Sequence, residues 1–202
     1  MKKNYIIFGI VIVIILAIIL FFVGKYNNLV TLEEGVDNKY ADIDVQLERR
    51  ADLIPNLVNT VKGYMQHEDD IIEQVTTARE NLVNAKNIEE KAIANNELSS
   101  ALNNLMVIVE NYPDLKSSTN FINLQDELAG TENRISTARR DYNNAVKEYN
   151  ATIKKIPTNI IASMSGFEKK NYFEVEIAIK GVLGYEMALD IVPSESGFRG
   201  IR

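Results

Sequence analysis

The chain has 202 residues and a formal net charge of −6, and it contains no cysteine and a single histidine, His67. Without cysteine there is no disulfide framework, thiol nucleophile, iron–sulfur cluster or cysteine zinc site. One histidine excludes motifs that bind zinc through two histidines. An acidic chain lacks the basic surface with which a general nucleic-acid binder displaces counterions. We therefore expect no cofactor, no metal ion and no nucleic-acid partner.

The N-terminal segment differs in composition from the rest of the chain. Residues 6–23 read IIFGIVIVIILAIILFFV and carry no charge. As a helix they would span about 27 Å, close to the hydrocarbon thickness of a bilayer. A cleaved signal peptide is the alternative, but the run exceeds the usual apolar region of about 7–15 residues, and no small residue lies three positions before a plausible cut. The sequence predicts an uncleaved anchor that contacts the lipid bilayer through residues 6–23.

The basic residues on the two sides of this anchor predict its orientation. Lys2, Lys3 and the α-amine precede the anchor, whereas Lys25 follows it and the next base is Lys39. Because basic residues near a span favour the cytoplasmic side, we expect a cytoplasmic N-terminus and residues 25–202 outside the cell membrane. The two flanks differ by only one lysine, so the reverse orientation is the alternative.

Long helices are predicted between residues 35 and 166, because glycine and proline are scarce there. Apolar residues recur every three or four positions in two stretches, as on one face of a bundle helix. The second stretch predicts a helix from Ser118 to Lys155, about 57 Å long. The two stripes are Val36, Tyr40, Ile43, Leu47, Ala51, Ile54, Val58, Val61 and Met65, and Phe121, Leu124, Leu128, Thr131, Ile135, Ala138, Tyr142, Val146, Tyr149, Ile153 and Ile156.

Two shorter helices are predicted between these stripes. Asp70-x-x-Glu73 and Asn87-x-x-Glu90 each resemble a capping box that opens a helix, and Pro113 should end the second of them. Four helices joined by short turns predict an all-α fold, with an N-terminal single transmembrane helix followed by an elongated antiparallel four-helix bundle.

Pro55 lies inside the first apolar stripe. A proline in a helix interior removes one backbone hydrogen bond. Either the helix kinks at this point or two helices meet at Leu53-Ile54. We favour the kink, because the stripe keeps its phase on both sides.

The sequence offers little catalytic or metal-binding chemistry. His67 is followed by Glu68, Asp69 and Asp70, but this spacing fixes no metal geometry, and acids are expected in a turn that opens a helix. No glycine-rich nucleotide loop, nucleophile elbow or S-x-x-K motif occurs. We therefore do not expect an enzyme, and a hydrolase built on carboxylates alone is the weakest alternative.

Two Tyr-Asn pairs, Tyr142-Asn143 and Tyr149-Asn150, lie seven residues apart and therefore on one helix face. We predict inward tyrosine rings whose hydroxyls and neighbouring amides join helices through hydrogen bonds.

The stretch 49–64, RRADLIPNLVNTVKGY, strongly resembles the signature of the LemA family. The resemblance implies a bacterial single-pass membrane protein with an elongated helical-bundle domain. It implies no reaction and no catalytic residues, since members are discussed as membrane-associated scaffolds, as an antigen source and in magnetosome membrane formation. Further stretches carry the resemblance at residues 26–30, 44–47, 96–99, 110–116, 124–135, 138–143 and 157–173.

The polar residues of this signature allow two interpretations. Arg49, Asp52, Asn56 and Asn59 follow one another at helical spacing, so they share a face. They either form an internal network of ion pairs and amides or a docking surface for a partner. The candidate docking residues are Arg49, Arg50, Asp52, Asn56, Asn59 and Arg139.

These observations predict three regions and one main function. Residues 1–24 form the cytoplasmic start and the anchor, residues 25–173 the helical bundle, and residues 174–202 a divergent extension that either contains a short strand at 175–179 or is disordered. We predict a non-enzymatic membrane-anchored scaffold or adaptor of the cell envelope, which contacts other membrane or envelope proteins. The alternative is an envelope sensor that binds a small ligand between its tyrosine-bearing helices and acts through a membrane partner. No oligomeric state is predicted, because the anchor lacks a G-x-x-x-G motif.

Overall fold

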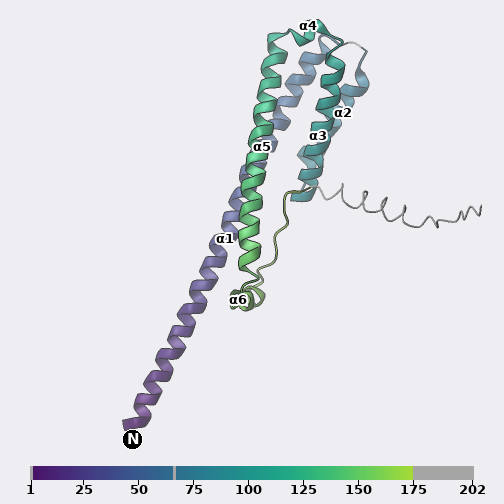
Figure 1. Cartoon of the computed structure of the whole chain (residues 1–202). Helices are drawn as coiled ribbons and strands as arrows, with labels where there is room; N and C mark the ends of the chain where they lie inside the picture. The colour runs from purple at the N-terminus through teal and green to yellow at the C-terminus, as the bar shows by residue number, and fades with distance from the viewer. Residues whose placement is uncertain (1, 66, 175–202) are drawn as a thin grey trace, which may run out of the picture.

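The computed structural model of the chain describes residues 2–65 and 67–174. Every regular element within these ranges is a helix (Figure 1), and this confirms the predicted all-α fold with one long apolar helix at the N-terminus. The strand considered for residues 175–179 lies outside the described residues. The helices are α1 (Lys2–Lys62), α2 (Asp69–Asn84), α3 (Ile88–Val109), α4 (Pro113–Lys116), α5 (Thr119–Thr152) and α6 (Thr158–Ser165).

Helix α1 is continuous from the apolar segment into the bundle. Its N-terminal part projects alone from the other helices (Figure 1), and its apolar window packs against nothing else in the described chain. This part is long and apolar enough to cross a membrane. Pro55 lies inside α1, so the alternative of two helices meeting at Leu53-Ile54 is wrong. Because α1 continues through Gly24, anchor and bundle share one helix.

Helices α1, α2, α3 and α5 make up the upper half of the bundle, and the short helix α4 connects α3 to α5 at its top (Figure 1). Helix α5 runs antiparallel to α1 and packs along it, while α2 and α3 form a hairpin beside this pair (Figure 1). The arrangement is compatible with the predicted antiparallel four-helix bundle. Helices α2 and α3 have 16 and 22 residues against the 34 of α5. The hairpin therefore covers only part of the length of the α1–α5 pair.

An extended segment, residues 167–174, covers the lower part of the α1–α5 pair. It rises from α6 toward the lower end of α3 (Figure 1). Phe173 is buried in the same apolar core as the bundle helices, and Phe167 and Tyr172 are half-buried against it. Where the α2–α3 hairpin ends, this segment thus supplies the third layer that the two long helices need to bury their apolar stripes.

Helix α6 turns the chain back at the base of the bundle. Ile161 and Ala162 pack against Leu29 of α1 in a small separate core. The helix ends at Gly166, whose φ of 77° is a left-handed conformation that glycine adopts without steric cost. The next residue, Phe167, then places its ring 5.6 Å from that of Tyr26.

Of the two predicted capping boxes, one is confirmed and the other is wrong. The capping box at Asn87 is confirmed, because its side chain accepts a hydrogen bond from the Glu90 N–H at 2.9 Å, while the Glu90 carboxylate accepts one from the Lys86 N–H at 2.7 Å. The box at Asp70 is wrong: α2 begins at Asp69, and its N-cap, Glu68, makes no capping hydrogen bond. The last long helix spans Thr119–Thr152, close to the predicted Ser118 to Lys155.

Candidate functional site

A buried arginine joins three helices inside the bundle. Arg50 of α1 is 4% exposed. Its Nη1 atom donates hydrogen bonds to Asn95 Oδ1 at 2.6 Å and to Ser99 Oγ at 3.1 Å, both on α3. The same atom lies 2.6 Å from Glu132 Oε2 on α5, in an ion pair. These four residues are called the Arg50 network below.

The electrostatics of the Arg50 network favour a structural role. Burial lowers the pKa of Arg50, and the charge of Glu132 partly offsets this effect. Such pairs add little net stability, but removing one partner is costly because the other is left uncompensated. Arg50 therefore belongs to the internal network. The prediction that Arg50 belongs to an exposed docking surface is corrected, because its side chain is buried.

Pro55 creates a contact between α1 and α2. Proline has no N–H, so the carbonyl of Ala51, four residues earlier, loses its partner within the helix. The Nε atom of Arg79 on α2 donates a hydrogen bond to this carbonyl at 2.9 Å. The Ala51 carbonyl, which has no partner within α1, thus accepts a hydrogen bond from a second helix.

We expect Arg79→Met to destabilise the bundle by about 1–2 kcal/mol, because it leaves the Ala51 carbonyl without a donor. In a Pro55→Ala background the restored N–H supplies that donor, so the same substitution should cost clearly less. Thermal unfolding of the four proteins in this double-mutant cycle measures the difference. Equal losses in both backgrounds would contradict this role of Arg79.

Four of the six candidate docking residues remain together on the surface. Arg49, Asp52, Asn56 and Asn59 are all exposed and follow one side of α1; they are called the α1 stripe below. Arg49 forms an ion pair with Glu127 of α5 at 2.9 Å, and both side chains are about half exposed. The stripe therefore lies beside the polar surface of α5.

Arg139 lies apart from the α1 stripe. Its guanidinium sits over the ring of Phe173, 4.9 Å from the ring centroid. This cation–π contact holds the extended segment against α5. Arg139 and Arg50 are therefore separate from the other four candidates, and both arginines contact other residues of the chain.

The asparagines of the two Tyr-Asn pairs bind the backbone of the extended segment. Asn150 accepts a hydrogen bond from the Lys170 N–H at 3.0 Å and donates one to the Lys170 carbonyl at 2.8 Å. Seven residues earlier, Asn143 makes the same two contacts with Phe173, at 2.9 and 3.4 Å. Each asparagine side chain therefore pairs with the N–H and the carbonyl of one residue, as the backbone of a neighbouring β-strand would. The prediction that these pairs join helix to helix is corrected, because their partner is the extended segment.

The tyrosines of these pairs are buried beneath the same segment. The hydroxyl of Tyr142 donates a hydrogen bond to the Asn171 carbonyl at 2.8 Å, and burial raises the pKa of Tyr142 to about 12. Tyr149 is fully buried, and within the described residues its hydroxyl has no hydrogen-bond partner. Both rings are packed in the apolar core of the bundle.

The extended segment also binds the acidic faces of two helices. The Lys170 amine lies 3.0 Å from Glu33 and 3.4 Å from Asp37 on α1. Asn171 donates a hydrogen bond to Glu89 on α3 at 2.5 Å. Sequence reasoning missed these partners, although the seven-residue spacing of the Tyr-Asn pairs marks the face that the segment occupies.

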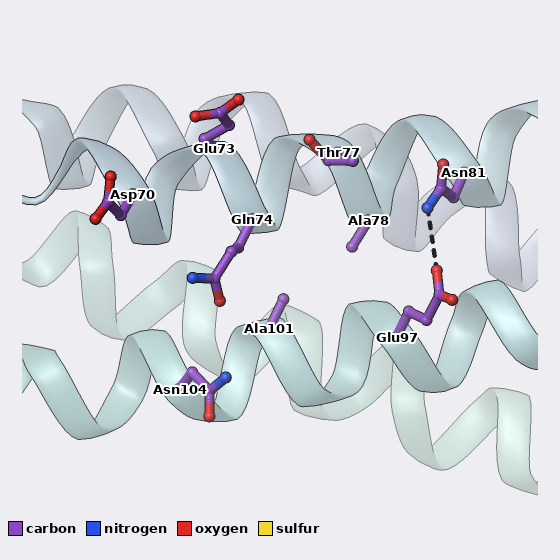
Figure 2. A pocket seen from close by; sticks show the side chains of 9 residues that line it. All are labelled: Asp70, Glu73, Gln74, Thr77, Ala78, Asn81, Glu97, Ala101 and Asn104. Atoms are coloured by element: carbon purple, nitrogen blue, oxygen red, sulfur yellow. Dashed lines mark hydrogen bonds between the residues drawn. The ribbon is translucent and has the colours of Figure 1, made fainter.

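A polar groove runs between α2 and α3, with a volume of about 630 Å³ (Figure 2). It exists because Ala78 and Ala101 are small where the helices meet, and the Asn81–Glu97 hydrogen bond of 3.1 Å spans it toward one end. Carboxylates and amides line it, and it contains no tyrosine, unlike the site expected for the sensor alternative. Its lining residues are Asp70, Glu73, Gln74, Thr77, Ala78, Asn81, Glu97, Ala101 and Asn104.

His67 and the acids that follow it lie at the start of α2. His67 is exposed in the turn before α2. Across residues 2–65 and 67–174, no three side chains of His, Asp or Glu converge where they could hold a metal ion. The acids that follow His67 include Asp69 and Asp70 in the first turn of α2, where they interact favourably with the helix dipole.

Comparison with known proteins places this arrangement in a family. Two proteins of Paramagnetospirillum magneticum, magnetosome proteins MamQ 1 and MamQ 2, are each 30% identical to the chain, covering 74% of it and 65% of their own length. Protein LemA of Metamycoplasma hominis is 26% identical over 70% of the chain and 65% of its own length. The chain thus spans somewhat less than two thirds of the length of these relatives. The model of the LemA family matches residues 39–181, which hold the Arg50 network, the α1 stripe and the Tyr-Asn pairs, and the chain belongs to the LemA family.

Proposed function

We propose that this chain is a non-enzymatic scaffold or adaptor of the bacterial cell envelope, which presents the α1 stripe to another membrane or envelope protein. The continuity of α1 carries the proposal. Arg49 and Asn59 lie 26 and 36 residues beyond Val23, or about 39 and 54 Å along one helix. A rigid helix would hold the stripe at a fixed height above the bilayer.

Two further observations support a scaffold. The Arg50 network and the Tyr-Asn pairs use conspicuous polar residues of the chain for internal contacts, whereas the α1 stripe beside Pro55 is exposed. Relatives that are named magnetosome proteins and Protein LemA support a membrane-associated role. The stripe consists of polar side chains beside α5, which suits hydrogen bonding with the polar surface of a partner.

We place the bundle on the outer side of the membrane, following the basic residues before the anchor. Because the chain has no cysteine, Asn56→Cys provides a unique label in the exposed stripe. We expect a membrane-impermeant maleimide to label this variant in intact cells or spheroplasts. Labelling that requires lysis would reverse the orientation.

The same unique cysteine tests the docking function. A cross-linker attached at Asn56→Cys should give one reproducible adduct with a membrane or envelope protein. Asn104→Cys, an exposed asparagine in the α2–α3 groove, is the matched control and should give none. Adducts of the same size from both positions would indicate non-specific capture and contradict a docking role for the α1 stripe.

A further inference from the structure

Helix α6 lies at the level where α1 leaves the bundle. Helices α1 and α5 are antiparallel, with Tyr142 beside Tyr40 at a ring distance of 6.1 Å. Further down, Ile153 packs against the core formed by Leu29 and α6. Leu29 lies six residues beyond Val23, the last residue of the apolar run, and this separation is about 9 Å along the helix.

The side of α6 opposite its buried face is apolar and exposed. Ile161 and Ala162 face Leu29 and are buried. In contrast, Ile160 and Met164, four residues apart on α6, are 51% and 80% exposed, and Ile156, in the turn before α6, is 84% exposed. Three large exposed apolar side chains in nine residues are unusual for a surface in water, and such a patch marks an interaction site.

The chain around α6 is basic, although the protein as a whole is acidic. Between Glu148 and Glu168 there is no acidic residue. Lys154 and Lys155 lie just before α6, and both are exposed. A patch that combines apolar side chains with lysines suits the interface of a bilayer that contains anionic lipids.

We propose that α6 rests on the bilayer surface beside the anchor, with Ile156, Ile160 and Met164 inserted between lipid headgroups and with Lys154 and Lys155 at lipid phosphates. We infer that the patch contacts lipid rather than a protein because α6 belongs to the same chain as the anchor. The anchor places α6 within reach of the bilayer interface, where amphipathic helices bury their apolar face about 5–10 Å deep. The inference rests on α1 spanning the membrane. It gives the bundle a second attachment to the bilayer, which fixes its tilt.

The absence of tryptophan from the chain permits a direct test. Full-length Ile160→Trp and Met164→Trp are reconstituted in vesicles of phosphatidylcholine and phosphatidylglycerol, with or without bromine on the acyl chains near the headgroup. We expect blue-shifted emission and stronger fractional quenching than in Leu16→Trp, because bromine near the headgroup lies closer to the interface than to the middle of the span. Val107→Trp, exposed at 72% near the C-terminal end of α3, is the water-facing control and should not be quenched.

The possible outcomes separate α6 from the anchor. Quenching at Leu16 but none at Ile160 and Met164 overturns the lipid contact while leaving the anchor intact, and protection of the same two positions from aqueous iodide would then identify a protein contact. No quenching at Leu16 overturns the anchor and the inference together. In a Lys154→Gln, Lys155→Gln background, quenching at Ile160→Trp should fall when phosphatidylglycerol is present and remain unchanged in pure phosphatidylcholine. Melting temperatures in detergent check that each variant is folded.

Discussion

Replacing Arg50 with alanine is expected to lower the free energy of unfolding by about 3 kcal/mol, the lower end of the cost of breaking a buried ion pair. We choose the lower end because Glu132 is 44% exposed and regains water when its partner is lost. Asn95 is buried and loses its donor. For a chain of this size the loss corresponds to a fall in melting temperature of roughly 6–12 °C. Thermal unfolding followed by circular dichroism in detergent measures it.

The adjacent arginine is the matched control. Arg49 makes a comparable ion pair with Glu127, but both side chains are about half exposed. Exposed pairs contribute about 0–1 kcal/mol, so Arg49→Ala should leave the melting temperature almost unchanged. If the two alanine variants melt at the same temperature, Arg50 does not hold α1, α3 and α5 together.

Replacing Phe173 with alanine is expected to release the extended segment. Phe173 is 1% exposed in the main core, and truncating a core phenylalanine costs about 3–5 kcal/mol. Because the segment is a short extended piece at one side of the bundle, the loss should appear as local opening rather than as global unfolding. Hydrogen exchange of the Lys170 and Phe173 amides measures it, since Asn150 and Asn143 accept their hydrogen bonds.

Both amides should exchange faster in Phe173→Ala, while the amides of α2 and α3 keep their protection. Glu174→Ala, which changes an exposed side chain next in sequence, is the control and should behave like the wild type. Unchanged protection at Lys170 and Phe173 would show that the two asparagines hold the segment without the aromatic contact. In that case the double amide contacts, rather than apolar burial, would dominate.

The helices could be predicted because their signal is local. Apolar side chains at intervals of three and four mark the buried side of α1 and α5, and most of them are buried in the structure. The Asn87 box was equally readable, since both of its hydrogen bonds lie within five residues. The Asp70 box failed because the same spacing fits residues inside the first turn of a helix that begins at Asp69.

The polar contacts could not be predicted, because their partners are distant in sequence. Arg50 lies beside the apolar stripe and next to Arg49, and nothing local distinguishes the buried guanidinium from the exposed one. Its partners Asn95 and Glu132 lie 45 and 82 positions away on other helices. The Tyr-Asn pairs were recognised as a helix face, but an extended segment gives no periodic signal by which it could be assigned to that face.

The most direct test of the scaffold proposal changes the α1 stripe without disturbing the core. Asn56→Arg in the full-length protein adds a long charged side chain at an exposed position, and Asn104→Arg makes the same change in the α2–α3 groove. Both variants should melt like the wild type. Co-purification from detergent-solubilised membranes should lose the partner that cross-links at position 56 in Asn56→Arg and keep it in Asn104→Arg. Retention of that partner by both variants would contradict docking through the α1 stripe.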